Sequence, residues 1–224
     1  MICGPFLPLP LSRARGPFTH TEWIFELKWD GFPALAYIDN GRCRLVSRNS
    51  NHFRSFPPLT DSIASALGSP SAVLDGEIVC LDEDGKPQFR DLLFRRGEPR
   101  FVAFDLLRLN GEDLHYTPLI ERKAKLRGIV PQKNDRLLYC DHVLGEGEGL
   151  FELACQQDLE GIVAKRKYDP YIAERARWLK ILTLRIRSGS VAKSCSSESA
   201  AAIRSIRSGM AVRWRVKLSR NVRT

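Results

Sequence analysis

The sequence contains no apolar stretch that approaches the ~20 residues of a transmembrane helix. Its first ten residues are apolar, but prolines interrupt them, and the arginines follow the apolar part instead of preceding it. That order does not match a secretory signal peptide. With 43% hydrophobic and 27% charged residues, the composition is typical of a globular protein. We therefore predict a soluble protein with no membrane partner.

The sequence also lacks any Cys-x-x-Cys pair. Its cysteines are widely separated: Cys3, Cys43, Cys80, Cys140, Cys155 and Cys195. Such spacing indicates neither a zinc site nor a disulfide framework. Reduced thiols and a cytoplasmic location are the expectation.

An excess of positive charge is confined to one end of the chain. The net charge is +9, and residues 185–224 hold ten Lys or Arg and one acidic residue. Residues 1–184 hold the other 25 basic and 25 acidic residues, so they are neutral overall. The high pI therefore says nothing about the partner of the main domain.

Short strands alternate with isolated helices along residues 23–184, and there is no internal repeat. We expect strands at 23–28, 34–38, 43–48, 72–81, 100–107, 137–143 and 161–165, and helices beginning at Pro57 and covering 118–127 and 149–157. Asn40-Gly41 and Asn110-Gly111 are typical hairpin turns. Antiparallel hairpins separated by single helices predict an α+β fold instead of a doubly wound sheet.

Three segments follow from this pattern. Residues 1–22 are a lead-in, 23–184 form the main domain, and 185–224 are a tail rich in serine and arginine. Within the tail, 200–206 have the composition of a short helix and 210–218 of a short strand. The segment lacks the apolar content for a core of its own, so we expect a disordered or loosely docked tail.

Lys28 is the strongest candidate for a reactive residue. It ends the alternating run 23–28, on the same face as Glu26, and stands just before the turn residues Asp30-Gly31. A lysine amine is nucleophilic only when it is unprotonated, so such a residue needs a pocket with neighbouring charges. A surface lysine before a hairpin turn is the alternative.

Five further segments place polar groups at strand ends or turns. They are Ser47-Arg48-Asn49, Asp75-Gly76-Glu77, Phe101 to Asp105, Glu160 to Lys165, and Trp178-Leu179-Lys180. Each segment taken alone also has a purely structural interpretation: a solvated strand end, a turn, a core aromatic, a helix end or a surface charge. The order and spacing of all six are more specific than any one of them.

The six motifs together resemble those of the covalent nucleotidyltransferases, and among them the ATP-dependent DNA ligases of bacterial end-joining repair. The resemblance extends from Glu26 to Lys180. It implies a ligase core in which antiparallel sheets flanked by helices form a nucleotide cleft. It also implies ATP and Mg²⁺ or Mn²⁺ as cofactors, nicked duplex DNA as substrate, end-joining repair proteins as partners, and work on the bacterial nucleoid.

The resemblance assigns a role to individual residues. It makes Lys28 the nucleophile that accepts AMP, with Asp30 ordering the turn beside it. For the nucleotide it implies Glu26 as acceptor of the adenine amino group, Phe104 as the stacking ring, Glu77 at the ribose or at a metal-bound water, and Lys165 and Lys180 at the phosphates. It makes Glu160, with Glu77, a metal ligand, and Arg48 the residue that binds a DNA 5′-phosphate.

Three features depart from the family pattern. Pro33 stands where the nucleophile motif continues to an arginine, and Leu182 stands where the last motif has a second lysine. Residues 185–224 stand where family members continue into an oligonucleotide-binding barrel, which suggests a frameshift or truncation. We expect nick sealing to be impaired and self-adenylation to survive weakly, since removing one preorganised charge costs ~10- to 1000-fold.

Two further hypotheses remain open at this point. The chain could be an RNA ligase or a GTP-using capping enzyme of the same superfamily, although the wording of the last two motifs is closer to DNA ligases. It could also be an inactive remnant that binds nucleotide or DNA without forming a covalent intermediate.

Overall fold

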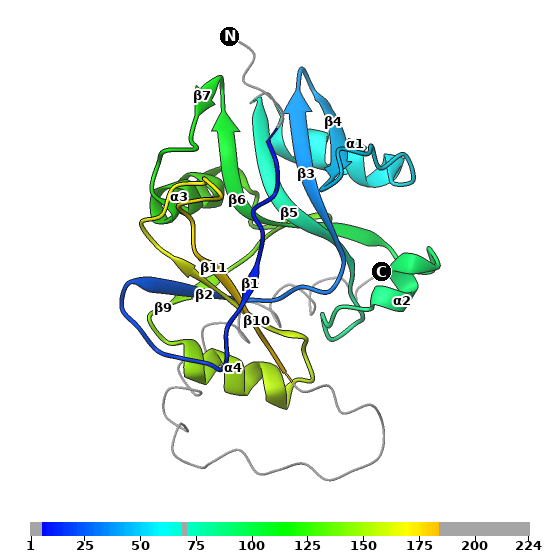
Figure 1. The fold of residues 1–224 in the computed structure, drawn as a ribbon. Coiled ribbons are helices and arrows are strands. Elements are labelled where there is room, and N and C mark those ends of the chain that lie inside the picture. The colour runs from blue at the N-terminus through cyan, green and yellow to red at the C-terminus, as the bar shows by residue number, and fades with distance from the viewer. Residues whose placement is uncertain (1–5, 69–70, 184–224) are drawn as a thin grey trace.

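Two β-sheets with a few helices form the structure (Figure 1). The computed structural model describes residues 6–68 and 71–183. The five-stranded sheet has the order β1 (Ser12–Arg13), β11 (Trp178–Leu182), β10 (Gly161–Arg166), β2 (Trp23–Leu27) and β9 (His142–Leu144). The six-stranded sheet has the order β4 (Arg42–Ser47), β3 (Phe32–Asp39), β5 (Ala72–Cys80), β6 (Pro99–Leu109) and β7 (Glu112–Asp113), with β8 (Leu137–Tyr139) also paired to β6. The helices are α1 (Pro57–Leu67), α2 (Phe89–Leu93), α3 (Leu119–Ile129) and α4 (Gly147–Gln156).

Most strand pairs are antiparallel, and the pairs β1–β11 and β6–β8 are parallel. The predicted α+β class, with antiparallel sheets flanked by helices, is confirmed. The Asn40-Gly41 turn joins β3 to β4, and both residues have positive φ angles, 49° and 70°, as the hairpin turn requires. No helix within residues 6–68 and 71–183 has the length and apolar character needed to span a membrane.

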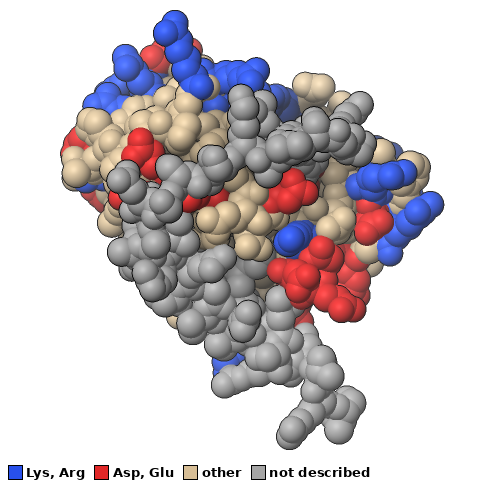
Figure 2. Space-filling view, turned by 90° about the horizontal axis from the view of Figure 1, so that it is seen from below, with Lys and Arg blue, Asp and Glu red and all other residues tan. Residues whose placement is uncertain are grey.

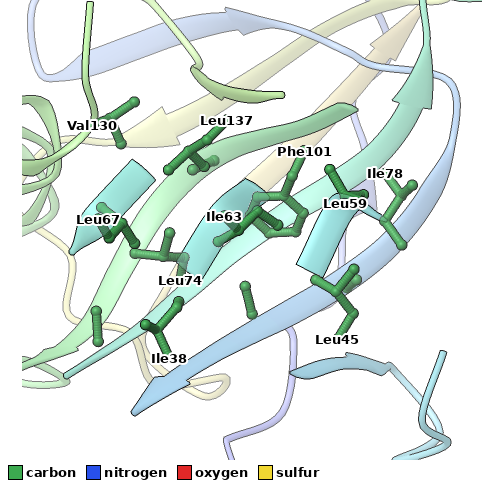
Figure 3. Packing of buried hydrophobic residues seen from close by; sticks show 14 of the residues in the cluster. Ile38, Leu45, Leu59, Ile63, Leu67, Leu74, Ile78, Phe101, Val130 and Leu137 are labelled. Carbon is green, nitrogen blue, oxygen red and sulfur yellow. The ribbon is translucent and has the colours of Figure 1, made fainter. Parts of the chain in front are cut away.

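Each sheet has one face covered by a helix. Leu59, Ile63 and Leu67, the predicted apolar stripe of α1, are buried against the six-stranded sheet, where Leu74 and Phe101 meet them (Figure 3). α4 covers the five-stranded sheet in the same way and lies below it in Figure 1. The residues of that second core include Phe25, Leu150, Ala154, Ile162, Ala164 and Ile181.

The opposite faces of the two sheets are turned toward each other. Trp178 of β11 packs in one cluster with Leu35 of β3, Val73 of β5 and Leu107 of β6. Because side chains alternate along a strand, the residues next to those that contact α4 point to this inter-sheet side. Glu26, Lys28 and Lys165 therefore project toward the six-stranded sheet, as the alternation in residues 23–28 predicts.

Several details differ from the prediction, among them the two-residue strands β1 and β7, which were not predicted. The single strand expected at 137–143 is two strands, β8 and β9, because the chain passes from one sheet to the other at Cys140 and Asp141. The short helix α2 was not predicted, since five residues give too little periodicity. The helix and strand expected within 185–224 lie outside the described residues.

The lead-in contributes to the five-stranded sheet and to the core between the two sheets. Ser12–Arg13 form the edge strand β1, and Phe6 and Leu9 are buried in the cluster around Trp178. The boundaries at 22 and 184 stay predictions.

Glycine is required at the start of β10. Gly161 has a φ of 148°, and a Cβ there would overlap the Ile181 carbonyl oxygen. We expect Gly161→Ala to lower the free energy of unfolding by more than about 1 kcal/mol, because strain and steric overlap add. At exposed Gly128 in α3, an added Cβ would meet no atom within 4 Å, so Gly128→Ala should raise that free energy by about 0.5–1 kcal/mol. Urea unfolding of both variants tests this, and equal effects would contradict it.

Candidate active site

The predicted nucleophile lies beside a predicted metal ligand. Lys28 Nζ forms an ion pair of 2.7 Å with Glu160 Oε2, and the two side chains are 17% and 25% exposed. The Lys28 backbone N–H donates to the Gly161 carbonyl at 2.9 Å, which continues the pairing of β2 with β10. The strand register therefore brings together two residues that are 132 positions apart.

A second carboxyl group lies within electrostatic range of this pair. Burial raises the pKa of Glu77 on β5 to about 8, and the negative charges of Glu160 and Asp30 add to the rise, while Lys28 opposes it. Glu77 is also held by a hydrogen bond from the Gly31 backbone. Four of the predicted site residues thus share one location, with a single lysine among three carboxyl groups.

Glu26 forms a separate, fully buried ion group. It is 2% exposed and accepts from Lys123 Nζ at Oε1, while Lys165 Nζ lies 2.6 Å from Oε2. Burial by itself would raise the pKa of Glu26, but the two ammonium groups outweigh it and hold that pKa below its ordinary value. Glu26 is therefore a carboxylate whose orientation is fixed from two sides.

Aromatic rings cover the second lysine of this group. Lys165 Nζ lies 4.4 Å from the centroid of the Phe104 ring and 3.9 Å from that of Trp178. Lys165 is four residues from Gly161 along β10, which is about 13 Å at ~3.3 Å per residue. The structure therefore places Lys165 with Glu26 and Phe104 instead of beside Lys28. The roles of Lys165 at the phosphates and of Phe104 at the adenine stay predictions.

Lys180 and Arg48 lie at the margins of the candidate site. Lys180 on β11 is paired with Val163, which is paired in turn with Glu26, so these residues form one row across the sheet. Arg48 is exposed in the turn after β4. Within residues 6–68 and 71–183 we find no hydrogen bond or ion pair between Arg48 and the other predicted site residues.

Sequence reasoning assigned no role to two buried cations of α3. Lys123 is completely buried and also donates to the Cys140 carbonyl at 2.9 Å and, at 3.3 Å, to that of Phe104. Its neighbour Arg122 forms a bidentate pair with Asp105, with distances of 2.8 and 2.7 Å. The available signal was the helix spacing of Leu119, Arg122, Lys123 and Leu126, which places two cations in a buried stripe.

Asp75 is a further buried acid behind this group. It accepts from the Tyr171 hydroxyl at 2.7 Å, and its other carboxyl oxygen has no hydrogen-bond partner among the described residues. Burial raises the pKa of Asp75 to about 7, against the Tyr171 hydrogen bond, and the nearby charge of Asp105 raises it further. The Asp75-Gly76-Glu77 motif therefore directs one acid into the interior, where Tyr171 meets it, and the other toward Lys28.

The carboxyl groups near Lys28 fit a cation that is shared with a ligand. No group of three or more His, Cys, Asp or Glu side chains within residues 6–68 and 71–183 has the arrangement of a metal site. Mg²⁺, however, is usually held by one or two carboxylates together with substrate phosphates and water. Glu77 and Glu160 supply two such groups, so the residues present fit a magnesium ion that is completed by phosphate oxygens.

The two departures from the family pattern lie next to this site. Pro33 on β3 is paired with Glu77, and Leu182 on β11 is paired with Gly161, whose carbonyl binds the Lys28 backbone. Both therefore place an uncharged side chain near the Lys28 end of the two sheets.

On the part of the lower face that is visible in Figure 2, acidic side chains gather in one region.

Removing the buried ammonium of Lys123 should leave an uncompensated charge. We expect Lys123→Met to lower the free energy of unfolding by about 3–5 kcal/mol, the cost of breaking a buried ion pair from one side. Lys125→Met, which removes an exposed ion pair with Glu112, should change it by less than about 0.5 kcal/mol. Denaturant unfolding of both variants tests this, and a mild effect at position 123 would show that Lys165 alone satisfies Glu26.

Glu77 should make stability depend on pH. Its pKa is raised in the folded state, so the unfolded chain loses the proton at lower pH and stability falls as pH rises from about 4.5 to about 8. Glu77→Gln should weaken that fall, whereas exposed Glu83→Gln should follow the parent chain. Urea unfolding midpoints measured between pH 4.5 and pH 8 test this prediction. Parallel plots of midpoint against pH for the parent and both variants would contradict it.

Known proteins match both the sequence and the fold. The family model described as ATP dependent DNA ligase domain matches residues 11–181. The multifunctional non-homologous end joining protein LigD of Pseudomonas aeruginosa is 35% identical over 167 residues, which cover 71% of this chain and 20% of that protein. The SPbeta prophage-derived DNA ligase-like protein LigB of Bacillus subtilis is 30% identical over 185 residues, which cover 78% of this chain and 66% of that protein.

The solved structure of mycobacterial DNA ligase D complexed with ATP and MES has a TM-score of 0.68 and 31% identity, and covers 78% of this chain and 59% of that chain. A structure of the bacteriophage T7 ATP-dependent DNA ligase shares the fold at 15% identity, with a TM-score of 0.51. The chain spans about a fifth of the length of the LigD proteins that it matches. It belongs to the family of ATP-dependent DNA ligases and carries their catalytic domain in the form that occurs in LigD.

Proposed function

We propose that this chain forms a lysyl-AMP on Lys28 and passes the AMP to a DNA 5′-phosphate for nick sealing in repair. The observation that carries the proposal is the position of Lys28, paired with Glu160 at 2.7 Å and adjacent to Glu77. A lysine among carboxyl groups that fit a divalent cation is what transfer of a phosphoryl group to an amine requires.

The first step would join Lys28 Nζ to the α-phosphorus of ATP, with loss of the amine proton and release of pyrophosphate. Glu160 pairs with Lys28 Nζ at 2.7 Å and so orients the side chain. A Mg²⁺ or Mn²⁺ ion held by Glu160 and Glu77 would supply positive charge at the phosphates. Competition of the metal for the Glu160 carboxylate would release Lys28 Nζ from the ion pair, and the ammonium would lose its proton to solvent before the amine attacks.

The base of ATP would lie toward Phe104, with the carboxylate of Glu26 as acceptor for the adenine amino group. Support for this comes from the fixed orientation of Glu26 between Lys123 and Lys165. An acceptor that cannot rotate favours an amino group over the carbonyl of guanine. Lys180 and Arg48 would contact phosphates of the nucleotide and of the DNA end, respectively.

The two later steps would act on DNA. An oxygen of the 5′-phosphate would attack the α-phosphorus, breaking the bond to Lys28, and a 3′-hydroxyl would then attack the 5′-phosphorus and release AMP. Nicked duplex DNA is therefore the proposed substrate. Partnership with end-joining repair proteins is proposed from the LigD relatives, and the cytoplasmic location stays a prediction.

Incubation with α-labelled ATP and Mg²⁺, followed by a denaturing gel, tests the first step. We expect a labelled protein band, no band with Lys28→Ala, and a normal band with Lys86→Ala as a matched lysine control. Substituting labelled GTP should give no band if the base is recognised as proposed. No band from the parent chain at high protein and metal concentration would favour the inactive remnant.

A further inference from the structure

The lead-in places a cation beside Lys180. β1 runs parallel to β11 at the edge of the five-stranded sheet, with Ser12 paired to Leu179 and Arg13 to Lys180. The Ala14 N–H donates to the Lys180 carbonyl at 3.1 Å, which fixes this register. Paired residues on adjacent strands point to the same side, so Arg13 and Lys180 share one face.

That face is the inter-sheet side. Ala14 and Leu179 pack with the cluster under α4, on the other face of the sheet. Leu11 and Trp178 pack with the cluster that joins the two sheets. Arg13 follows the alternation of Leu11, and Lys180 that of Trp178, so both cations point to the side that carries Lys28 and Glu26.

The two cations have no acidic partner within residues 6–68 and 71–183. The row across the sheet reads Arg13, Lys180, Val163, Glu26. Glu26, its one acid, is already engaged by Lys123 and Lys165. Like charges on directly paired positions destabilise a sheet, so this arrangement costs stability unless an anion lies between them. Arg13 is exposed and Lys180 is half-buried, which leaves both open to a ligand.

We propose that Arg13 and Lys180 together bind a phosphate group on the inter-sheet face that also carries Lys28, so that β1 is part of the active site. Lys180 is two residues from Leu182, whose partner Gly161 binds the Lys28 backbone. Lys180 is therefore about 7 Å along the strand direction from the row of the nucleophile and two strands, about 10 Å, across the sheet from β2, and Arg13 is one strand farther away. The guanidinium group supplies two parallel N–H donors that match phosphate oxygens. The phosphate would belong to ATP or to the DNA 5′ end; the inference rests on the proposed function for the identity of these ligands.

The test measures equilibrium binding in the full chain with Lys28→Ala, so that no covalent product forms. One arm compares ATP with adenosine, and the other compares nicked duplex carrying a 5′-phosphate with the same duplex carrying a 5′-hydroxyl. Arg13→Gln should reduce the preference for the phosphorylated ligand by about 10-fold or more in one arm, the value of a charge-assisted hydrogen bond. Arg15→Gln, which removes a nearby exposed arginine outside β1, should leave both preferences unchanged.

The arm in which the preference changes identifies the source of the phosphate.

Without ligand, the unfolding temperature of Arg13→Gln should not fall, because one of two like charges is removed. If Arg13 had a purely structural role, its replacement would lower the unfolding temperature. If it falls, Arg13→Lys becomes the test, since it keeps the charge but loses the paired donors and should lose part of the preference. The proposal would be overturned if Arg13→Gln and Arg15→Gln showed the same preference for the phosphorylated ligand in both arms. It would also be overturned if the parent protein bound neither phosphorylated ligand. Absence of labelled lysyl-AMP would overturn the proposed function while leaving these binding ratios measurable.

Discussion

The buried carboxylate of Glu26 is the interaction on which the arrangement of the site depends. Two ammonium groups from distant parts of the chain converge on it: Lys165 from the adjacent strand β10 and Lys123 from α3. Because Lys123 also binds the carbonyls of Phe104 and Cys140, one charged cluster ties α3 and the six-stranded sheet to the five-stranded sheet. A buried carboxylate with only one of these partners would carry a large desolvation cost, so each connection supports the others.

Charge is distributed differently at the two ends of this inter-sheet region. Near Glu26, two lysines and aromatic rings surround one acid in the interior. Near Lys28, one lysine stands among Glu160, Glu77 and Asp30, where the side chains reach solvent. The first arrangement sets two buried ammonium groups against one carboxylate, whereas the second has an excess of acidic groups over lysine. This asymmetry separates a buried end of the region from an end that reaches solvent.

Much of the fold could be predicted because local patterns agreed with the tertiary structure. The alternation in β2, the Asn40-Gly41 turn and the four-residue spacing in α1 each report burial on one face, and the structure buries those faces. The resemblance implied that Lys28 and Glu160 belong to one site, but their ion pair was not predicted, since no local rule specifies contacts over such a separation. Lys123 was missed because a lysine in a helix is ordinarily solvated, and its burial depends on an acid on another strand. The edge strand β1 was missed because two residues carry no detectable period.

The order of strands in the five-stranded sheet has a consequence for how the chain folds. Its neighbours β1 and β11 come from opposite ends of the described residues, and β2 pairs with β10. The six-stranded sheet instead pairs strands that follow one another closely from β3 to β7. Closing long loops is slow compared with forming hairpins, so the six-stranded sheet can assemble while the chain is still being synthesised. The pairing of β2 with β10 must wait until β10 has emerged, so the pair of Lys28 with Glu160 can form only after most of the six-stranded sheet is available.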